Sequence, residues 1–278
     1  MVFEHALAAM ERSGQPLFGP TSFRDYVSQY DIETRSRTPR YISVDSLPDL
    51  APELREHDVM VLRVGTADGT GTAFLCVDSP DGVEAFFLQD AEIYTGQSVE
   101  KFSSPLGRER LLGFDLLPRR SETSLVNLGL ASGVLSESLR LDTSGALPPP
   151  ATGNSTFTFP IKPHSDISTT VTHRRGQVEI DTLFAERRNG ELALFVIEAK
   201  TGSRGSLAKH KLMYPVLALA DSVPSDIEII PVYLRCRRDD DTITFDVAEC
   251  EMPDPRTTLP AVTDLTVTET RVLELAIQ

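Results

Sequence analysis

The chain has 278 residues, 40% of them hydrophobic, and a formal net charge of -14, so it can build one large core or two modest ones. Its three cysteines, Cys76, Cys236 and Cys250, are far apart and form no CxxC pair, which argues against a zinc site and a disulfide framework. No run approaches 18 apolar residues, and the first residues lack a basic segment followed by an apolar core, so we expect a cytoplasmic protein that neither enters a membrane nor is exported.

The first 120 residues are predicted to form an α+β domain. Apolar periodicity predicts helices over residues 2–12, 22–30 and 46–56. Strands are expected over 59–64, 72–77 and 85–88, joined by turns at Asp68-Gly69 and Asp81-Gly82, which predicts a small antiparallel meander. Substrate recognition, partner binding and dimerisation all remain open as roles for this domain.

Residues 121–278 are predicted to form a second domain. Ser121 is expected to cap a helix that runs to about Leu141, followed by a strand over 155–161. Alternating and apolar patterns predict strands over 177–186 and 192–200, then a helix over 206–220 and a strand over 227–236. Residues 242–247 and 265–275 are expected to add further strands.

Charged residues gather on the hairpin formed by strands 177–186 and 192–200, whose turn contains Asn189-Gly190. Alternate side chains of a strand share a face, so Glu179 lies beside Asp181, and Glu198 beside Lys200. Glu198 and Lys200 directly follow an apolar run and therefore need charged partners or a metal. Mg²⁺ prefers one or two carboxylates together with water and phosphate oxygens. The pattern therefore favours in-line hydrolysis of a phosphodiester, in which the lysine orients or deprotonates the attacking water or neutralises developing charge.

An acid on one strand and a Glu-X-Lys triplet on the next resemble the signature of the PD-(D/E)XK nuclease superfamily, supplied here by Asp181 and by Glu198-Ala199-Lys200. The resemblance covers about residues 121–236, where the predicted elements follow the superfamily order αβββαβ. It implies a restriction-endonuclease-like core with a central mixed sheet. It also implies a DNA endonuclease that uses Mg²⁺, or Mn²⁺ in its place, bound by Asp181 and Glu198.

A branch of this superfamily that resembles RecB and archaeal repair nucleases carries a glycine before the metal acid and a Gln-X-X-X-Tyr motif on the following helix. Gly176 precedes Glu179 by three positions, and His210 to Tyr214 keeps the second spacing with histidine in place of glutamine. The glycine spacing favours Glu179 as the metal ligand, whereas the general pattern favours Asp181. We favour Asp181, with Glu179 orienting water or a second metal.

The first helix of such folds often adds another acid, and the candidates are Glu122 and Glu137. Glu122 lies on the shoulder of the helix face that carries the leucines, and Glu137 lies nearly opposite, so we favour Glu122 as an auxiliary acid. Its alternative role is a favourable interaction with the helix dipole.

Basic residues concentrate in the predicted nuclease core. Residues 101–238 carry a net charge of +4, whereas residues 1–100 carry -10 and residues 239–278 carry -8. The side chains expected to contact nucleic-acid phosphates are Arg174, Arg175, Arg204, Lys209, His210 and Lys211. A solvated polar surface is the alternative explanation of this charge.

The chain has 5 lysines against 22 arginines and 41 acids, a composition that resembles proteins of salt-accumulating halophilic archaea. In molar salt the Debye length falls to about 3 Å, so distant acids barely oppose the binding of a polyanion. The sequence thus favours a DNA endonuclease of restriction, defence or repair, with a homodimer as one arrangement. The alternatives are a catalytically inactive module of the same fold that binds nucleic acid or protein, and a non-nuclease adaptor.

Overall fold

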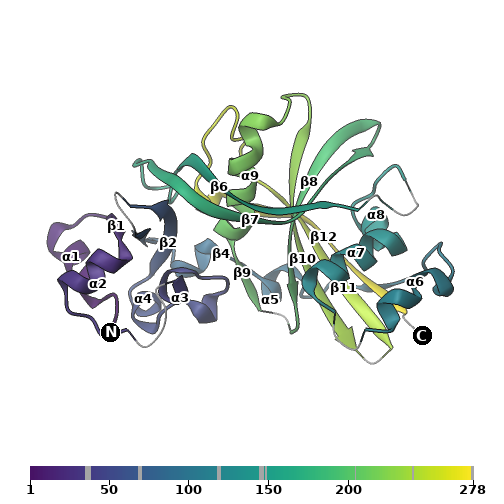
Figure 1. Ribbon diagram of the computed structural model, residues 1–278, viewed down its shortest axis with the longest axis horizontal. Coiled ribbons are helices and arrows are strands. Elements are labelled where there is room, and N and C mark those ends of the chain that lie inside the picture. Colours follow the sequence, from purple (N-terminus) through teal and green to yellow (C-terminus); the bar gives the residue numbers. More distant parts are fainter. Residues whose placement is uncertain are drawn as a thin grey trace.

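The computed structural model describes residues 1–34, 39–67, 71–117, 120–143, 147, 149–203, 205–239 and 241–276. It shows a mixed α/β protein in which small helices at one end of the molecule are joined to a large mixed sheet (Figure 1). Within these residues, no helix has the length and apolarity needed to span a bilayer.

The N-terminal region begins with α1 (Glu4–Ser13), β1 (Leu17–Ser22) and α2 (Phe23–Gln29). Gly14 ends α1 in the left-handed conformation, and the Ser22 side chain caps α2 by accepting a hydrogen bond from Asp25 N. The two helices therefore lie where periodicity predicts them. Strand β1 was not predicted, because its Gly19-Pro20 pair is typical of a turn.

The prediction of one helix over residues 46–56 is wrong. The segment contains a 3₁₀ turn at Leu47–Asp49 and a short helix, α4 (Pro52–Glu56), separated by extended backbone at Leu50 and Ala51. Pro52 lacks an amide donor and disfavours helical backbone in the residue before it, so the helix starts anew at the proline. The preceding helix, α3 (Pro39–Ile42), is a single turn.

The predicted meander is correct for two of its three strands. β2 (Val59–Thr66) and β3 (Thr72–Asp78) pair in antiparallel fashion, while their predicted turn at Asp68-Gly69 lies outside the described residues. Residues 83–86 form a 3₁₀ helix instead of strand, and β4 (Phe87–Gln89) pairs with β9 (Ser206–Ala208), far away in the sequence.

The second half follows the predicted order with altered ends. The single predicted helix 121–141 is two helices, α7 (Glu122–Ser132) and α8 (Val134–Ser138), because Gly133 between them has a φ of 86°. The remaining elements before the last strands are β6 (Ala151–Ile161), β7 (Val171–Arg188), β8 (Glu191–Thr201), α9 (Lys209–Leu219) and β10 (Glu228–Asp239). The hairpin prediction is confirmed, since β7 and β8 pair antiparallel around Asn189-Gly190.

Ten strands of the described chain form one sheet, whose main order is β1-β3-β2-β7-β8-β10-β11-β12-β5, with β6 paired to β7. The added members are β11 (Thr242–Glu251), β12 (Thr266–Ala276) and β5 (Val99–Phe102). β8 and β10 are parallel, and α9 lies between them in the chain, which makes a βαβ crossover. Because β5 pairs with β12, residues before 120 also belong to this sheet; the domain division near residue 120 stays a prediction.

Two glycines allow β2 to join β7. A Cβ on Gly65 would lie 2.2 Å from the carbonyl oxygen of Arg174, and a Cβ on Gly176 would lie 2.3 Å from the His173 ring and 2.5 Å from Gly65 Cα. Thr66 Oγ1 also donates a hydrogen bond to Arg174 O at 3.0 Å. The N-terminal strands are therefore held against β7 at a backbone approach that larger residues would prevent.

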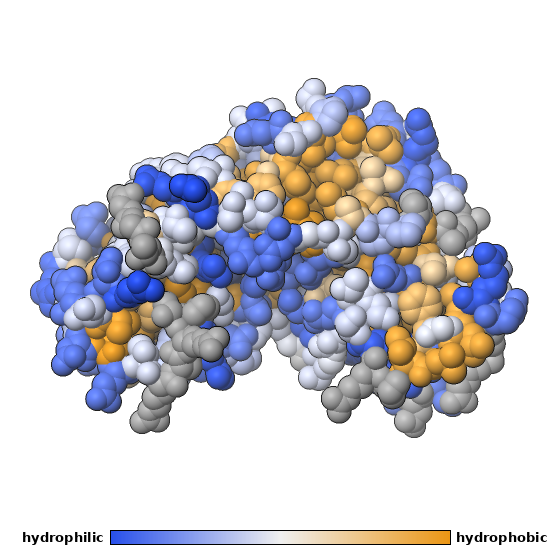
Figure 2. Space-filling view, viewed as in Figure 1, coloured by the Kyte–Doolittle hydropathy of each residue, from blue (hydrophilic) through white to orange (hydrophobic). Residues whose placement is uncertain are grey.

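The apolar core consists of three clusters of buried side chains along the sheet. Figure 2 shows several orange areas on one face of the molecule, and one of them lies over α6 (Arg108–Asp115). Leu112 of α6 and Leu116, directly after it, are 51% and 72% exposed. The helix α5 (Asp90–Ile93) lies between β4 and β5 in the chain, and its first residue, Asp90, is fully buried.

Candidate functional site

A cleft of about 440 Å³ is lined by residues of β2, β7, β8 and α9 and by the segment around residue 45. All five residues predicted to serve catalysis line it, namely Glu122, Glu179, Asp181, Glu198 and Lys200. His210 and Lys211, predicted to contact nucleic acid, line it as well. Chain segments that are distant in sequence thus bring the predicted acids and the lysine to one place.

Asp181 and Glu198 face each other across the hairpin. The antiparallel register ends with Thr182 opposite Ile197, so Asp181 and Glu198 lie one position further from the turn, on neighbouring strands. Asp181 Oδ2 accepts a hydrogen bond from Ala199 N at 3.3 Å, which ties the first strand's acid to the second strand. Hard carboxylate oxygens from neighbouring strands are the donor set that Mg²⁺ prefers, so the chemistry of this pair fits such an ion.

Glu198 is the most buried acid of the pair, with 6% of its surface exposed. Burial raises its pKa to about 7; Lys200 works against this shift and Asp181 adds to it. Lys200 Nζ lies 2.8 Å from Glu198 Oε1. Burial disfavours the Lys200 ammonium, but Glu198, Glu122 and Asp45 outweigh that effect, so its pKa lies above its ordinary value. Lys200 is therefore a cation held by the predicted metal ligand.

The two auxiliary acids, Glu122 and Glu179, differ in exposure and in hydrogen bonding. Glu122, in the first turn of α7, accepts hydrogen bonds from Thr201 N at 3.0 Å and from Thr201 Oγ1 at 3.4 Å. It thereby fixes the chain directly after Lys200. Glu179 is exposed at the cleft and accepts a hydrogen bond from Gln177 at 3.4 Å.

An aromatic wall closes the cleft on the side of α9. His210 and Tyr214, one helical turn apart, have ring centroids 5.3 Å apart, and the His173 ring of β7 lies 5.2 Å from Tyr214. His210 is buried, not solvated on the helix surface, which was the alternative that the sequence left open. Within the described residues, His173 Nδ1, His210 Nδ1 and Tyr214 Oη are buried and have no hydrogen-bond partner. Such atoms are costly in a folded protein and are typical of functional sites.

The two histidines of this wall should make the protein sensitive to acid. Burial lowers the pKa of His210 to about 3 and that of His173 to about 4. Both pKa values lie below the ordinary 6.5, so the stabilisation is present above pH 6.5 and is lost as pH falls towards the folded-state values. Between pH 7 and pH 5, each histidine is expected to cost about 2 kcal/mol in the free energy of unfolding.

Urea unfolding at pH 7 and pH 5 measures this loss. The variant His210→Phe, which keeps an aromatic ring without the titrating group, is expected to remove about half of the drop in unfolding free energy assigned to the two rings. His5→Phe, a change of an exposed histidine on α1, is the matched control and should keep the full drop. An unchanged drop in His210→Phe would refute the assignment.

Sequence reasoning missed the part of the site that comes from the N-terminal region. Asp45 Oδ1 lies 2.5 Å from Lys211 Nζ, and Arg63 of β2 lines the cleft near His173. Arg63 carried a usable signal, because it is a lone charge within the apolar run Val59–Val64. Residues 1–100 have a net charge of -10, which did not suggest a phosphate-binding residue in this region.

The other predicted phosphate contacts do not line this cleft. Arg174 and Arg175 are exposed on β7, before the part of the strand that supplies most of its cleft residues. Arg204 lies outside the described residues. Lys209 is 9% exposed, donates a hydrogen bond to Thr263 O at 3.0 Å, and lines a separate cavity. Its ammonium is therefore used inside the fold.

Several other cations of the basic segment are likewise bound within the protein. Arg188 lies 2.6 Å from Glu249, and Arg237 binds both carboxylate oxygens of Asp246 at 2.6 and 3.0 Å. Arg235 is buried against Asp90 at 2.6 Å. Much of the positive charge of residues 101–238 thus stabilises the fold and does not form one free phosphate-binding surface.

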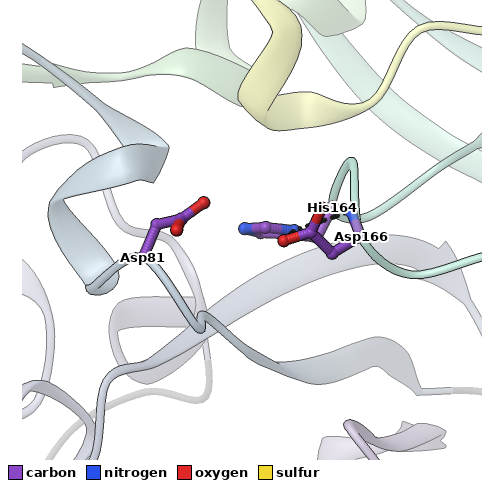
Figure 3. A group of neighbouring side chains, drawn as sticks. All are labelled: Asp81, His164 and Asp166. Atoms are coloured by element: carbon purple, nitrogen blue, oxygen red, sulfur yellow. Dashed lines mark hydrogen bonds and ion pairs between the residues drawn. The ribbon is translucent and has the colours of Figure 1, made fainter.

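Asp81, His164 and Asp166 form another group of potential ligand atoms, all within 4.8 Å of one another. Figure 3 shows the His164 ring between the two acids. His164 Nδ1 accepts a hydrogen bond from Asp166 N at 3.1 Å, so this nitrogen has a partner within the loop. The ring also contacts Phe86.

A family model described as "Domain of unknown function (DUF6997)" matches residues 100–259, more than half of the chain. This segment contains all five predicted catalytic residues, whereas Asp45 and Arg63 lie before it. No curated protein and no solved structure matches the chain. The chain therefore belongs to the DUF6997 family.

Proposed function

We propose that this protein is a metal-dependent nuclease that hydrolyses phosphodiester bonds of DNA in the cleft between β7, β8 and α9. The observation that carries the proposal is that Asp181 and Glu198, from neighbouring strands of the hairpin, line one cleft, with Lys200 Nζ 2.8 Å from Glu198 Oε1. Two carboxylates and a cation at one opening match the requirements of phosphodiester hydrolysis.

The order of elements supports the proposal. A helix, three strands, a helix and a strand follow one another as α8, β6, β7, β8, α9 and β10, interrupted by the short β9. The sheet is mixed, since β7 and β8 are antiparallel whereas β8 and β10 are parallel. We assign this core to the restriction-endonuclease-like class on the basis of this order and of the acids and lysine that it carries.

Asp181 and Glu198 would hold the metal, Mg²⁺ or Mn²⁺, which when bound supplies a Lewis acid and lowers the pKa of coordinated water. Lys200 remains a cation beside Glu198 and stabilises negative charge that develops on the phosphate. Glu122 positions Lys200 indirectly through its hydrogen bonds to Thr201. Glu179, exposed at the same opening, is suited to orient the attacking water.

Cleavage assays test this function directly. Supercoiled, linear and single-stranded DNA are incubated with the protein at several salt concentrations, with Mg²⁺, Mn²⁺ or EDTA. We expect products with either metal and none with EDTA, and the product ends then separate a restriction or defence role from repair. DNA binding without cleavage under all conditions would instead favour an inactive module of the same fold.

Metal binding can be measured without cleavage. At a metal concentration about 100 times the dissociation constant, binding is expected to stabilise the fold by about 2.7 kcal/mol and to raise the Tm by several degrees. Glu198→Gln should lose this Tm shift, because the glutamine amide is uncharged and offers one oxygen to the metal where the carboxylate offers two. Glu191→Gln, an exposed change at the start of the same strand, should keep it. A Tm that is the same in Mg²⁺, Mn²⁺ and EDTA for the unaltered protein would contradict the metal site.

A further inference from the structure

We infer that Arg63, a residue of the N-terminal region, is a phosphate-binding residue of the cleft. The inference rests on the proposed function for the class of ligand, because a nucleic-acid strand supplies the phosphates. It gives the N-terminal region a role that the sequence left open: this region completes the substrate-binding wall.

The half-buried position of Arg63 in an otherwise apolar strand is the first observation. β2 (Val59–Thr66) has eight residues, of which seven are apolar or small. Arg63 is its one charged residue. A charge in such a strand is costly unless it is paired. Within the described residues, the Arg63 side chain makes no hydrogen bond and no ion pair, although several acids line the same cleft. Its guanidinium is therefore available to an anionic ligand.

The position of Arg63 is the second observation. Gly65 pairs with Arg174 of β7, and the close approach of Gly65 to Gly176 locks the two strands together two residues from Arg63. Arg63 acts on His173 electrostatically by lowering its pKa, which places its charge beside the aromatic wall. The residue is thus held on a rigid element at the same opening as Asp181 and Glu198.

The chemistry of the cleft assigns separate tasks to its cations. Lys200 is bound to Glu198, and Lys211 is bound to Asp45. Arg63 presents a planar fork of donors that suits two oxygens of one phosphate. The carboxylates would repel the phosphates of a nucleic-acid strand, so a free cation in the same cleft is needed for the strand to bind. Arg63 therefore binds a phosphate of the substrate, while the hairpin residues act at the phosphodiester bond that is hydrolysed.

Binding of fluorescein-labelled 20-nucleotide single-stranded DNA, and of the corresponding duplex, is measured by anisotropy in EDTA over a series of salt concentrations. Arg63→Met is expected to weaken binding about 10- to 100-fold. It should also reduce the slope of log Kd against log salt by about 0.7 for the single strand and about 0.9 for the duplex, the signature of one lost phosphate contact. A merely structural role would not change this slope.

Two variants serve as controls. Arg63→Lys keeps the charge and should keep the salt slope while losing part of the affinity, because the ammonium cannot bind two oxygens in parallel. Arg55→Met removes an exposed arginine of the same region and should bind as the unaltered protein does. Unchanged affinity and slope in Arg63→Met would overturn the inference, as would a failure of the unaltered protein to bind either DNA. Arg63-dependent binding without metal-dependent cleavage would sustain the inference and refute the proposed catalysis.

Discussion

Asp181→Asn is expected to lower the rate of metal-dependent DNA cleavage about 100- to 1,000-fold, because the amide keeps the shape of the side chain but removes the charge that holds the metal. Lys200→Met should cause a loss of the same order by removing the cation 2.8 Å from Glu198. Single-turnover rates on a labelled substrate, with enzyme in excess, measure both effects without interference from product release.

Matched variants separate catalysis from folding. Asp226→Asn and Lys101→Met change exposed residues outside the cleft and should cut at the unaltered rate. Far-UV circular dichroism and urea unfolding then establish that Asp181→Asn and Lys200→Met are folded. Folded variants that retain full cleavage would show that the chemistry takes place elsewhere or belongs to a contaminant.

Asp90→Asn is expected to lower the free energy of unfolding by about 3–5 kcal/mol, because it leaves Arg235 buried without a counter-charge. Asp90 is fully buried, and its carboxylate lies 2.6 Å from Arg235 Nε and accepts hydrogen bonds from Tyr233 Oη at 2.8 Å and Gly205 N at 2.6 Å. These bonds attach α5 to β10 and to the loop before β9. Urea unfolding at pH 7 measures the loss.

The ion pair of Glu100 with Arg271 provides the comparison, because Glu100 lies largely in solvent. Glu100→Gln should cost no more than about 1 kcal/mol. The double variant Asp90→Asn with Arg235→Met should recover part of the stability lost in Asp90→Asn, since it removes the unpaired charge. Equal losses in Asp90→Asn and Glu100→Gln would contradict the role of burial.

The hairpin is the part of the fold that local sequence specified best. Alternation along residues 177–186, the apolar run before Glu198 and the Asn189-Gly190 turn all act over a few residues, and each agrees with the observed pairing of β7 and β8. The same alternation placed Asp181 and Glu198 on faces that a simple hairpin brings together. Of the two candidate auxiliary acids, Glu122 lines the cleft, while Glu137 pairs with Arg271 elsewhere.

Errors arose where distant segments decide local structure. Residues 85–88 have the apolar character of a strand, but only Phe87–Gln89 is extended, because its partner is β9 and not the neighbouring β3. Two other errors had local causes: Pro52 and Gly133 divide predicted helices, and both effects were readable from the residues themselves. Lys209, predicted to contact phosphate, is bonded within the fold for another reason. Its partner, Thr263, is far away in the chain.

Local sequence thus determined the elements of the hairpin and the identity of its acids and lysine, because strand periodicity and turn chemistry depend on neighbouring residues. Long-range packing decided which cations remain available and which segments complete the cleft. Arg63 reaches it only because Gly65 and Gly176 let β2 approach β7, and His210 is buried only because α9 packs there against β7. Such contacts depend on the closure of long loops and on shape, which no local pattern encodes.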